Sequence, residues 1–370
     1  MFPFFGFLLA AVLLTTAKAG EERSLFGKKG EKATLVVTTC GETALAKSLR
    51  FQWFLATLRL YLSRDYDELL ERVVVVWNSG EPVSGAVLRL RDIEAREGRA
   101  GKLVVVATGS KSLNNRWIKT IPYVKTEVVV NVDDDVVALK PAIECLLLHS
   151  RPGYLVGPFV RAVGPSFRYC MSEQTDTPKP GYAIVLPRVM VMRRDHLLAY
   201  AEAPRDFLRF VDYEPAHSDD ILLNLLAGQT NKLRVILPKN TVIDYARLCH
   251  EHNGHKDQGL GTKKHRAFTR TAAMRTMGLH YTDAMQPLYD TATCDLSPGG
   301  ENLTARAVRD GEHRQLFDTM FWRGKTTGDS IAPLCNNNNT NNLDTAQLFE
   351  TTNIWTSLSR ARDEAPRGHS

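Results

Sequence analysis

The stretch Glu127-Val128-Val129-Val130-Asn131-Val132 runs directly into Asp133-Asp134-Asp135. The run is apolar almost throughout rather than alternating, which predicts a strand covered on both faces. Such strands are typical of parallel α/β sheets, where ligands bind in the crevice beyond the carboxyl ends of the strands. The three aspartates are therefore expected at the ligand-binding edge of a sheet.

Three further apolar runs lie upstream, with helical stretches between several of them; they span residues 34–39, 72–77 and 103–107. This β-α-β rhythm predicts an α/β fold with a mostly parallel central sheet flanked by helices. We also expect helices over 42–63, 141–149, 195–213 and 219–228, and strands over 154–160, 182–186 and 233–237. No repeat of 20–50 residues is visible, which disfavours solenoids and propellers.

The composition narrows the class of protein. The 370 residues are 44% hydrophobic and 24% charged, a globular mixture that excludes wholesale disorder and a polytopic membrane protein. The net charge of +6 is too weak for a dedicated nucleic-acid binder, and it is compatible with a phosphate-bearing substrate. Six cysteines, none in a CxxC pair, exclude a disulfide scaffold.

The amino terminus predicts entry into the secretory pathway. Residues 2–14 are uncharged and almost wholly apolar, and Ala17-Lys18-Ala19 supplies a cleavage pattern, so residues 1–19 are interpreted as a signal peptide. A retained membrane anchor is the alternative. Either form predicts a location in the lumen of the Golgi or the endoplasmic reticulum, where Asn302 and Asn338 are glycosylation acceptors.

The ordered part of the chain is expected to end before the carboxyl terminus. We place a catalytic domain at 33–282. Residues 285–370, which include the asparagine-rich stretch 336–342, are interpreted as a low-complexity, partly disordered tail.

The acidic triplet suits a hard divalent metal ion. Mn²⁺ and Mg²⁺ take oxygen ligands and commonly bridge one or two carboxylates to substrate phosphates, whereas a solvated turn is the alternative. A second acidic pair, Asp219-Asp220, opens an apolar helix. Either aspartate could simply cap that helix, or one could cap it while the other faces the cleft.

Four segments, in order, resemble the exostosin-type glycosyltransferases of family 64, which include the exostosin-like N-acetylhexosaminyltransferases. The resemblance covers about residues 33–280. The segments are Thr34-Leu35-Val36-Val37-Thr38-Thr39, Val73-Val74-Val75-Val76-Trp77-Asn78, Val130-Asn131-Val132-Asp133-Asp134-Asp135, and Tyr182-Ala183-Ile184-Val185-Leu186 followed by Asp219-Asp220-Ile221.

The resemblance implies a GT-A fold, a UDP-sugar donor, Mn²⁺ and transfer with retention at the anomeric carbon. It implies that Asp135 is the principal metal ligand. Asp133 and Asp134 would contact the ribose and the donor sugar, and Thr39 and Asn78 would bind the nucleotide end of the donor.

Two arginines also match family positions. Asn115-Arg116 resembles an N-R pair whose arginine reaches the donor, and Arg270 stands where the family has an arginine near the diphosphate. Asp219 and Asp220 match the carboxylates that face the reacting carbon. Asp220 would then stabilise that carbon or act as the nucleophile, and Asp219 would position the acceptor hydroxyl.

The chain departs from the family pattern at a few positions. The family has a cysteine before its D-D pair and another three residues after the matching arginine; here these positions are Ser218 and Ala273. Glu42 stands where the family often has arginine, and Lys111 where it often has asparagine.

The sequence is compatible with three functions. The first is a glycosyltransferase that acts on a glycan or glycoconjugate acceptor, without nucleic acid and with the amino-terminal segment as the only membrane contact. The second is a nucleotidyl- or phosphosugar-handling enzyme, and the third is a non-catalytic glycan-binding domain of the same fold.

A histidine cluster at 250, 252 and 255 is interpreted as a polar surface loop, because its spacing lacks helical ligand geometry.

Overall fold

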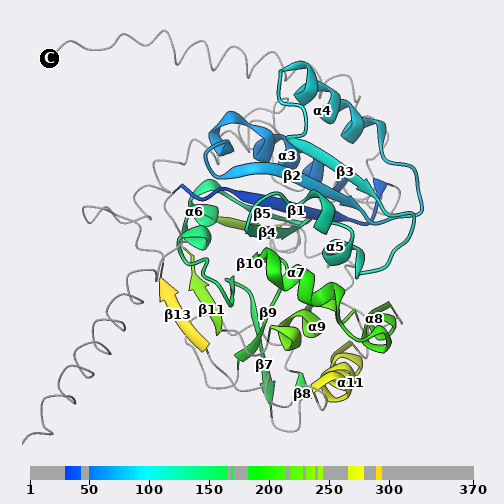
Figure 1. Ribbon diagram of the computed structural model, residues 1–370, viewed down its shortest axis with the longest axis vertical. Helices are drawn as coiled ribbons and strands as arrows, with labels where there is room; N and C mark the ends of the chain where they lie inside the picture. The colour runs from blue at the N-terminus through cyan, green and yellow to red at the C-terminus, as the bar shows by residue number, and fades with distance from the viewer. Residues whose placement is uncertain are drawn as a thin grey trace, which may run out of the picture.

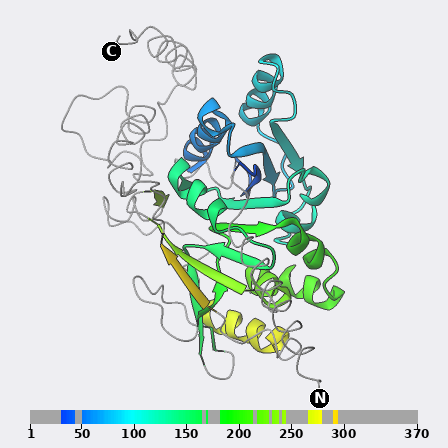
Figure 2. The same cartoon turned by 60° about the vertical axis from the view of Figure 1, so that its left-hand side comes forward.

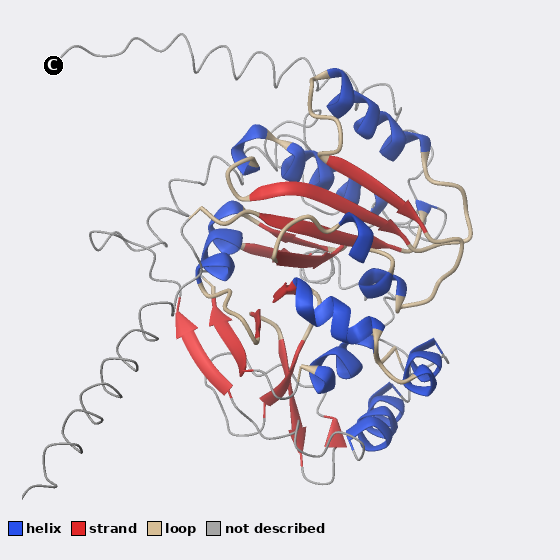
Figure 3. Cartoon of the chain, in the orientation of Figure 1, coloured by secondary structure: helices blue, strands red, loops and turns tan. Residues whose placement is uncertain are grey.

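The computed structural model describes residues 30–42, 50–164, 168–169, 182–212, 217–227, 231–237, 241–244, 266–278 and 289–293. They contain an eight-stranded sheet in the order β13-β11-β6-β10-β4-β1-β2-β3 (Figures 1 and 3). Its strands are β1 (Ala33–Thr39), β2 (Leu70–Trp77), β3 (Leu103–Ala107), β4 (Val128–Asp133), β6 (Tyr154–Gly157), β10 (Val189–Arg193), β11 (Asn231–Ile236) and β13 (Tyr289–Thr293). The pairs run parallel except those of β10, which is antiparallel to β4 and β6, so the expected mostly parallel sheet is confirmed.

Side chains along the central strands alternate between two apolar clusters, one on each face of the sheet. In β1, Leu35 and Val37 join the first cluster and Val36 joins the second. The first cluster takes side chains from α3 (Arg50–Leu62), α4 (Gly85–Arg96) and α6 (Lys140–Leu148). The second takes them from α5 (Asn115–Ile118), α7 (Arg194–Ala201), α9 (Asp219–Leu226) and α11 (Arg266–Gly278). Helices on both faces explain why the strands are apolar throughout.

Smaller elements surround this core. β5 (Val136–Ala138) pairs with β12 (Val242–Asp244), and β7 (Val160–Gly164) pairs with β8 (Arg168–Tyr169) and β9 (Tyr182–Val185). Two short 3-10 helices, η2 (Arg64–Tyr66) and η3 (Ile121–Tyr123), are also present. None of the described helices is both long and apolar enough to cross a bilayer.

Two elements that we expected to be continuous are split at prolines. The helix expected over 195–213 is two helices, α7 and α8 (Arg205–Asp212), with Pro204 between them. The strand expected over 154–160 ends as β6 at Gly157, before Pro158, and the chain resumes as β7 in another sheet. Proline disfavours helical backbone in the preceding residue and donates no ladder hydrogen bond, so it ends both elements.

The sheet extends past the boundary expected at residue 282. β13 pairs in parallel with β11 and forms the edge of the sheet, where the two strands lie side by side in yellow tones (Figure 2). Its sequence, Tyr-Asp-Thr-Ala-Thr, has no apolar run, so only pairing identifies it as a strand. The segment 1–19, the two glycosylation acceptors, residues 43–49 of the first expected helix, the histidine cluster and the rest of the tail lie outside the described residues.

Candidate active site

The ends of the three central parallel strands bring the first predicted site residues together. In the register of the sheet, Thr38 of β1 lies opposite Asp133 of β4, and Thr39 lies opposite Trp77 of β2. The backbone N–H of Asn78 donates to the carbonyl of Thr39 at 2.8 Å. Parallel strands expose their carboxyl ends at one edge, so these residues share the crevice expected to hold a ligand.

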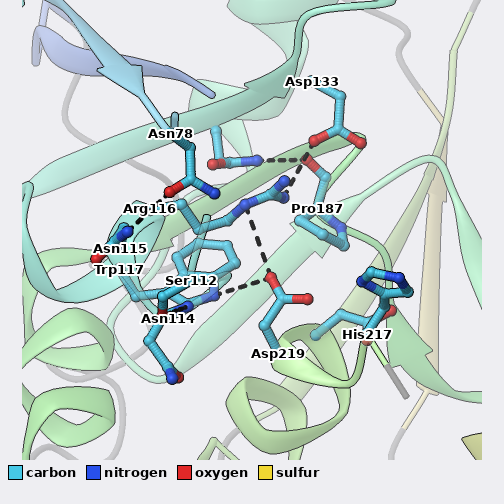
Figure 4. A network of polar contacts seen from close by, with 12 residues as sticks. Asn78, Ser112, Asn114, Asn115, Arg116, Trp117, Asp133, Pro187, His217 and Asp219 are labelled. Atoms are coloured by element: carbon cyan, nitrogen blue, oxygen red, sulfur yellow. Dashed lines mark hydrogen bonds and ion pairs between the residues drawn. The ribbon is translucent and has the colours of Figure 1, made fainter. Parts of the chain in front are cut away.

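Asn78 is tied to the helix that follows β3. The Nδ2 of Asn115, at the start of α5, donates to Asn78 Oδ1 at 2.8 Å (Figure 4). It also donates to Ser110 Oγ at 2.9 Å. Both amides are buried, with 5% and 6% of their surface exposed. This pairing orients the first turn of α5 and thereby directs Arg116, the next residue, into the site.

Arg116 connects the two acidic groups of the sequence. Its Nη1 lies 3.1 Å from Asp133 Oδ1, and its Nε lies 3.7 Å from Asp219 Oδ2 (Figure 4). The indole Nε1 of Trp117 donates to the same Asp219 oxygen at 3.1 Å. A single guanidinium group therefore joins the end of β4 to the start of α9.

Arg50 holds the other two aspartates of the triplet. Its Nη2 contacts Asp134 Oδ1 and lies 3.2 Å from Asp135 Oδ2. Arg50 is the first residue of α3. Glu42, which stands where the family often has an arginine, lies eight positions earlier and is exposed. No motif pointed to Arg50, because its role depends on where α3 begins in space.

Asp220 has its own arginine. Arg270 of α11 contacts Asp220 Oδ2 through Nη2 and the carbonyl of His217 through Nη1, and its guanidinium lies 4.4 Å from the centre of the Tyr169 ring. His217 adopts a positive φ of 40°, which is uncommon outside glycine and is enriched at functional sites. The structure thus places Arg270 against a carboxylate, as it does Arg116, rather than leaving either guanidinium exposed.

Neither aspartate of the second pair is the N-cap residue of its helix, although Asp220 Oδ1 accepts the backbone N–H of Ile221 in the first turn at 2.8 Å. Ser218 occupies the N-cap position of α9, and its side chain makes no capping hydrogen bond. Asp219 and Asp220 are the first two residues of the helix, and both are buried, with 5% and 4% exposed. Both alternatives stated for this pair are therefore wrong in placing an aspartate at the N-cap, and both carboxylates face side chains from other elements.

Burial dominates the electrostatics of these carboxylates. It raises the pKa of Asp133 to about 6, although Arg116 acts in the opposite direction. Burial also raises the pKa of Asp134 against the effect of Arg50, and that of Asp219 against the effect of Arg116. The arginines therefore offset only part of the penalty of burying these charges, and a further cation would stabilise the ionised site.

A count of the ion pairs supports the same conclusion. Among the described residues, six carboxylates and four guanidinium groups form three neighbouring groups of ion pairs, and their fully ionised forms together carry two negative charges, which one divalent cation would neutralise. The acidic residues are Asp133, Asp134, Asp135, Asp219, Asp220 and Asp244, and the basic residues are Arg50, Arg116, Arg188 and Arg270.

The triplet fits a hard metal ion that a substrate helps to hold. Asp134 Oδ2 and Asp135 Oδ1 are buried and have no hydrogen-bond partner. Carboxylate oxygens without donors are suitable ligands for Mn²⁺ or Mg²⁺. Among the described residues, no group of three or more Asp, Glu, His or Cys side chains is arranged to hold a metal by itself. The donor set therefore suits an ion shared between one or two carboxylates and phosphate oxygens.

Four partners in this site were missed from the sequence: Arg50, Trp117, Arg188 and Asp244. Trp117 directly follows the N-R pair, which is the one local signal that could have found it. At the departures from the family pattern, Ser218 and Ala273 are fully buried, and the Ser218 hydroxyl has no partner. Lys111 is exposed.

Comparison with known proteins identifies a family. The sequence model described as "Glycosyl transferase family 64 domain" matches residues 52–289. No curated protein sequence matches the chain.

Solved structures match at low similarity. The mannosyltransferase PcManGT from Pyrobaculum calidifontis, in complex with GDP-Man and Mn²⁺, is 15% identical, with 90% of this chain and 82% of that chain covered and a TM-score of 0.38. GalNAc-T7 with UDP, GalNAc and Mn²⁺ is 11% identical, with 46% and 37% covered and a TM-score of 0.34. A cytidylyltransferase from Leptospira borgpetersenii is 10% identical, with 70% and 97% covered and a TM-score of 0.33. Similarities of this size carry no argument about function.

Proposed function

Because the chain belongs to glycosyltransferase family 64, we propose that it transfers a sugar, an N-acetylhexosamine, from a UDP-sugar to a glycan or glycoconjugate acceptor. In this proposal the reaction retains the configuration of the anomeric carbon and uses Mn²⁺. The observation that carries the proposal is the position of Arg116, which joins the triplet to the acidic pair of α9. The aspartates proposed to hold the metal ion and the aspartates proposed to face the reacting carbon thereby belong to one site.

The donor would lie along the ends of β1, β2 and β4. Asp135 would hold Mn²⁺, which when bound supplies a Lewis acid for the negative charge on the departing diphosphate. Asp133 and Asp134 would bind the ribose and the donor sugar. Thr39, Asn78 and Asn115 would bind the nucleotide; the two amides are already ordered by their mutual hydrogen bond.

The carboxylates of α9 would act on the other side of the sugar. The bond between the anomeric carbon and the diphosphate oxygen breaks with its electron pair going to UDP, and the acceptor oxygen forms the new bond. Asp220 would offset the positive charge on that carbon or attack it, with Arg270 balancing its charge before the reaction. Asp219 would orient the acceptor hydroxyl, whose proton leaves to a carboxylate or to the released diphosphate.

UDP release tests the proposal directly. The full chain is incubated with Mn²⁺ and a panel of UDP-sugars, with and without oligosaccharide acceptors, and compared with Asp135→Asn. We expect at least a roughly 100-fold lower rate in the variant, because a ligand to the ion is removed. Thermal shift is expected only when UDP and Mn²⁺ are both present.

The matched control is Asp92→Asn, which neutralises an exposed aspartate paired with Arg91 on α4. This variant should keep the rate and the thermal shift of the unmodified chain. Release that is unaffected by Asp135→Asn or by a chelator would reject the metal assignment. Formation rather than consumption of a UDP-sugar would favour the nucleotidyl-handling enzyme, and no shift with UDP and Mn²⁺ would favour a non-catalytic domain.

The place of action is part of the proposal. The apolar segment at residues 2–14 supports a lumenal enzyme of the Golgi or endoplasmic reticulum, either cleaved or anchored by that segment. Protease protection in microsomes, together with the mass of the mature amino terminus, distinguishes the two forms.

A further inference from the structure

Arg188 and Asp244 lie beside the acidic triplet, although no sequence motif includes them. Arg188 belongs to the turn between β9 and β10, and its carbonyl accepts the backbone N–H of Asp133 at 2.9 Å. Asp244 ends β12 and stands opposite Val136 of β5 in their antiparallel register. Because Val136 is the residue after Asp135, this pairing places Asp244 at the far end of the triplet.

The guanidinium of Arg188 lies between two carboxylates but contacts only one closely. Its Nη2 is 2.8 Å from Asp244 Oδ2 and 3.9 Å from Asp135 Oδ1. Its other contact is with the Phe159 ring, whose centre lies 5.0 Å away. Asp135 Oδ1 is consequently buried without a hydrogen-bond donor.

Arg50 occupies the opposite oxygen of Asp135. Its Nη2 lies 3.2 Å from Asp135 Oδ2 and also contacts Asp134. One oxygen of Asp135 is therefore already shared with an arginine, and the other is the one that Arg188 approaches. Whether Oδ1 stays available to a metal ion depends on which carboxylate Arg188 prefers.

We propose that Asp244 holds Arg188 away from Asp135 and thereby keeps Asp135 Oδ1 available for the divalent cation. Asp244 and Arg188 are positioning residues for metal binding, and the inference rests on the proposed function. Without the negative charge of Asp244, Arg188 pairs with Asp135, and its guanidinium then competes with the cation for the same carboxylate. With Asp244 present, the positive charge of Arg188 is also neutralised near the ion.

A double-mutant cycle tests this arrangement. Mn²⁺ is titrated into the full-length chain in the presence of excess UDP, with UDP and Mn²⁺ without protein as the blank, and free Mn²⁺ is followed by electron paramagnetic resonance for the unmodified protein, Asp244→Asn, Arg188→Gln and the double variant. We expect Asp244→Asn to weaken Mn²⁺ binding about 10-fold, the lower end of effects from residues that orient metal ligands. Arg188→Gln should bind Mn²⁺ more tightly than the unmodified chain.

The double variant separates positioning from a structural role. If Asp244 acts only through Arg188, the double variant binds Mn²⁺ within about threefold of Arg188→Gln, because the two changes are coupled. Binding as weak as in Asp244→Asn would show that the loss comes from a disturbed β5–β12 pair and would overturn the proposal. Unchanged binding in Asp244→Asn would also overturn it.

Two controls keep the test decisive. Circular dichroism and urea unfolding check that each variant folds. If Asp244→Asn does not fold, Mn²⁺ binding by Arg188→Gln is the deciding measurement. Weaker Mn²⁺ binding by Arg188→Gln than by the unmodified chain overturns the inference. Absence of Mn²⁺ binding by the unmodified chain in the presence of UDP would instead reject the metal site of the proposed function, and the inference with it.

Discussion

The buried acids of the site are paired with arginines that come from other elements. Asp133 and Asp219 share Arg116, and Asp220 faces Arg270. Isolated charges at such depth are unfavourable, and each arginine offsets part of that penalty. Arg116 is the most informative of these residues, because two carboxylates depend on it.

Replacing Arg116 should reveal this dependence. Arg116→Gln leaves Asp133 and Asp219 without their main counter-charge, and we expect the free energy of unfolding to fall by about 3–5 kcal/mol. Urea unfolding at neutral pH measures the change. Arg91→Gln, which breaks an exposed pair with Asp92, should change stability by less than about 1 kcal/mol. Equal effects of the two variants would contradict the buried-bridge interpretation.

At the scale of elements, two helices begin with a serine but use it differently. Ser84 caps α4, because its hydroxyl accepts the backbone N–H of Ala86 at 3.2 Å. Ser218 precedes α9 without a capping bond, and its buried hydroxyl has no partner. The start of α9 is thus held by the contacts of Asp219 and Asp220 rather than by its N-cap.

This contrast predicts opposite responses to the same substitution. Ser84→Ala should lower the free energy of unfolding by about 1 kcal/mol, since it removes a cap. Ser218→Ala should leave stability unchanged or raise it by up to about 1 kcal/mol, because a buried unpaired hydroxyl is removed. Thermal and urea unfolding of the two single variants provide the measurement. A loss at Ser218 as large as that at Ser84 would show that its hydroxyl does stabilise α9.

At the scale of the whole molecule, one buried amine links stability to pH. Lys232 on β11 is 4% exposed, and burial lowers its pKa to about 8. In the unfolded chain the pKa returns to its ordinary value of 10.5. Below pH 8 the folded state must bury the charged amine, so stability is reduced there. Between pH 8 and 10.5 only the unfolded state holds the proton, and stability rises with pH.

Lys232→Met removes this linkage. At pH 7 we expect the variant to be more stable than the unmodified chain by about 3 kcal/mol, from roughly 1.4 kcal/mol for each unit of pKa shift. The difference should shrink as pH rises from 8 and vanish above about 10.5. Urea unfolding of both proteins at pH 7, 8, 9 and 10 follows it. A difference that is independent of pH would mean that Lys232 is not buried in its charged form.

Four neighbouring strands of the sheet, of which β3 is the edge strand, could be predicted because each leaves a local record in the sequence, a continuous run of apolar residues. The runs at 34–39, 72–77, 103–107 and 127–132 correspond to β1, β2, β3 and β4. β13 leaves no such record, because its polar strand is defined by pairing with β11. Pro158 separates β6 from β7, and Pro204 separates α7 from α8, although the apolar pattern predicts one continuous element at each place.

The candidate site was predictable to the extent that its residues sit in short motifs. The triplet, the N-R pair and the acidic start of α9 could be named from the sequence, and the roles assigned to them stay predictions. Arg50, Arg188 and Asp244 could not be named, since each lies far along the chain from the charged group with which it pairs. Their importance comes from distance in space, which no local pattern encodes.

The sequence by itself determined the family, the apolar strands and the acidic residues at their ends, because these depend on the order of neighbouring side chains. Only the tertiary structure decided which arginine faces which carboxylate and which oxygen of Asp135 is left without a donor. Those choices arise when strand ends, turns and helix starts from distant parts of the chain meet, and buried charges then take the nearest partner that the packing supplies.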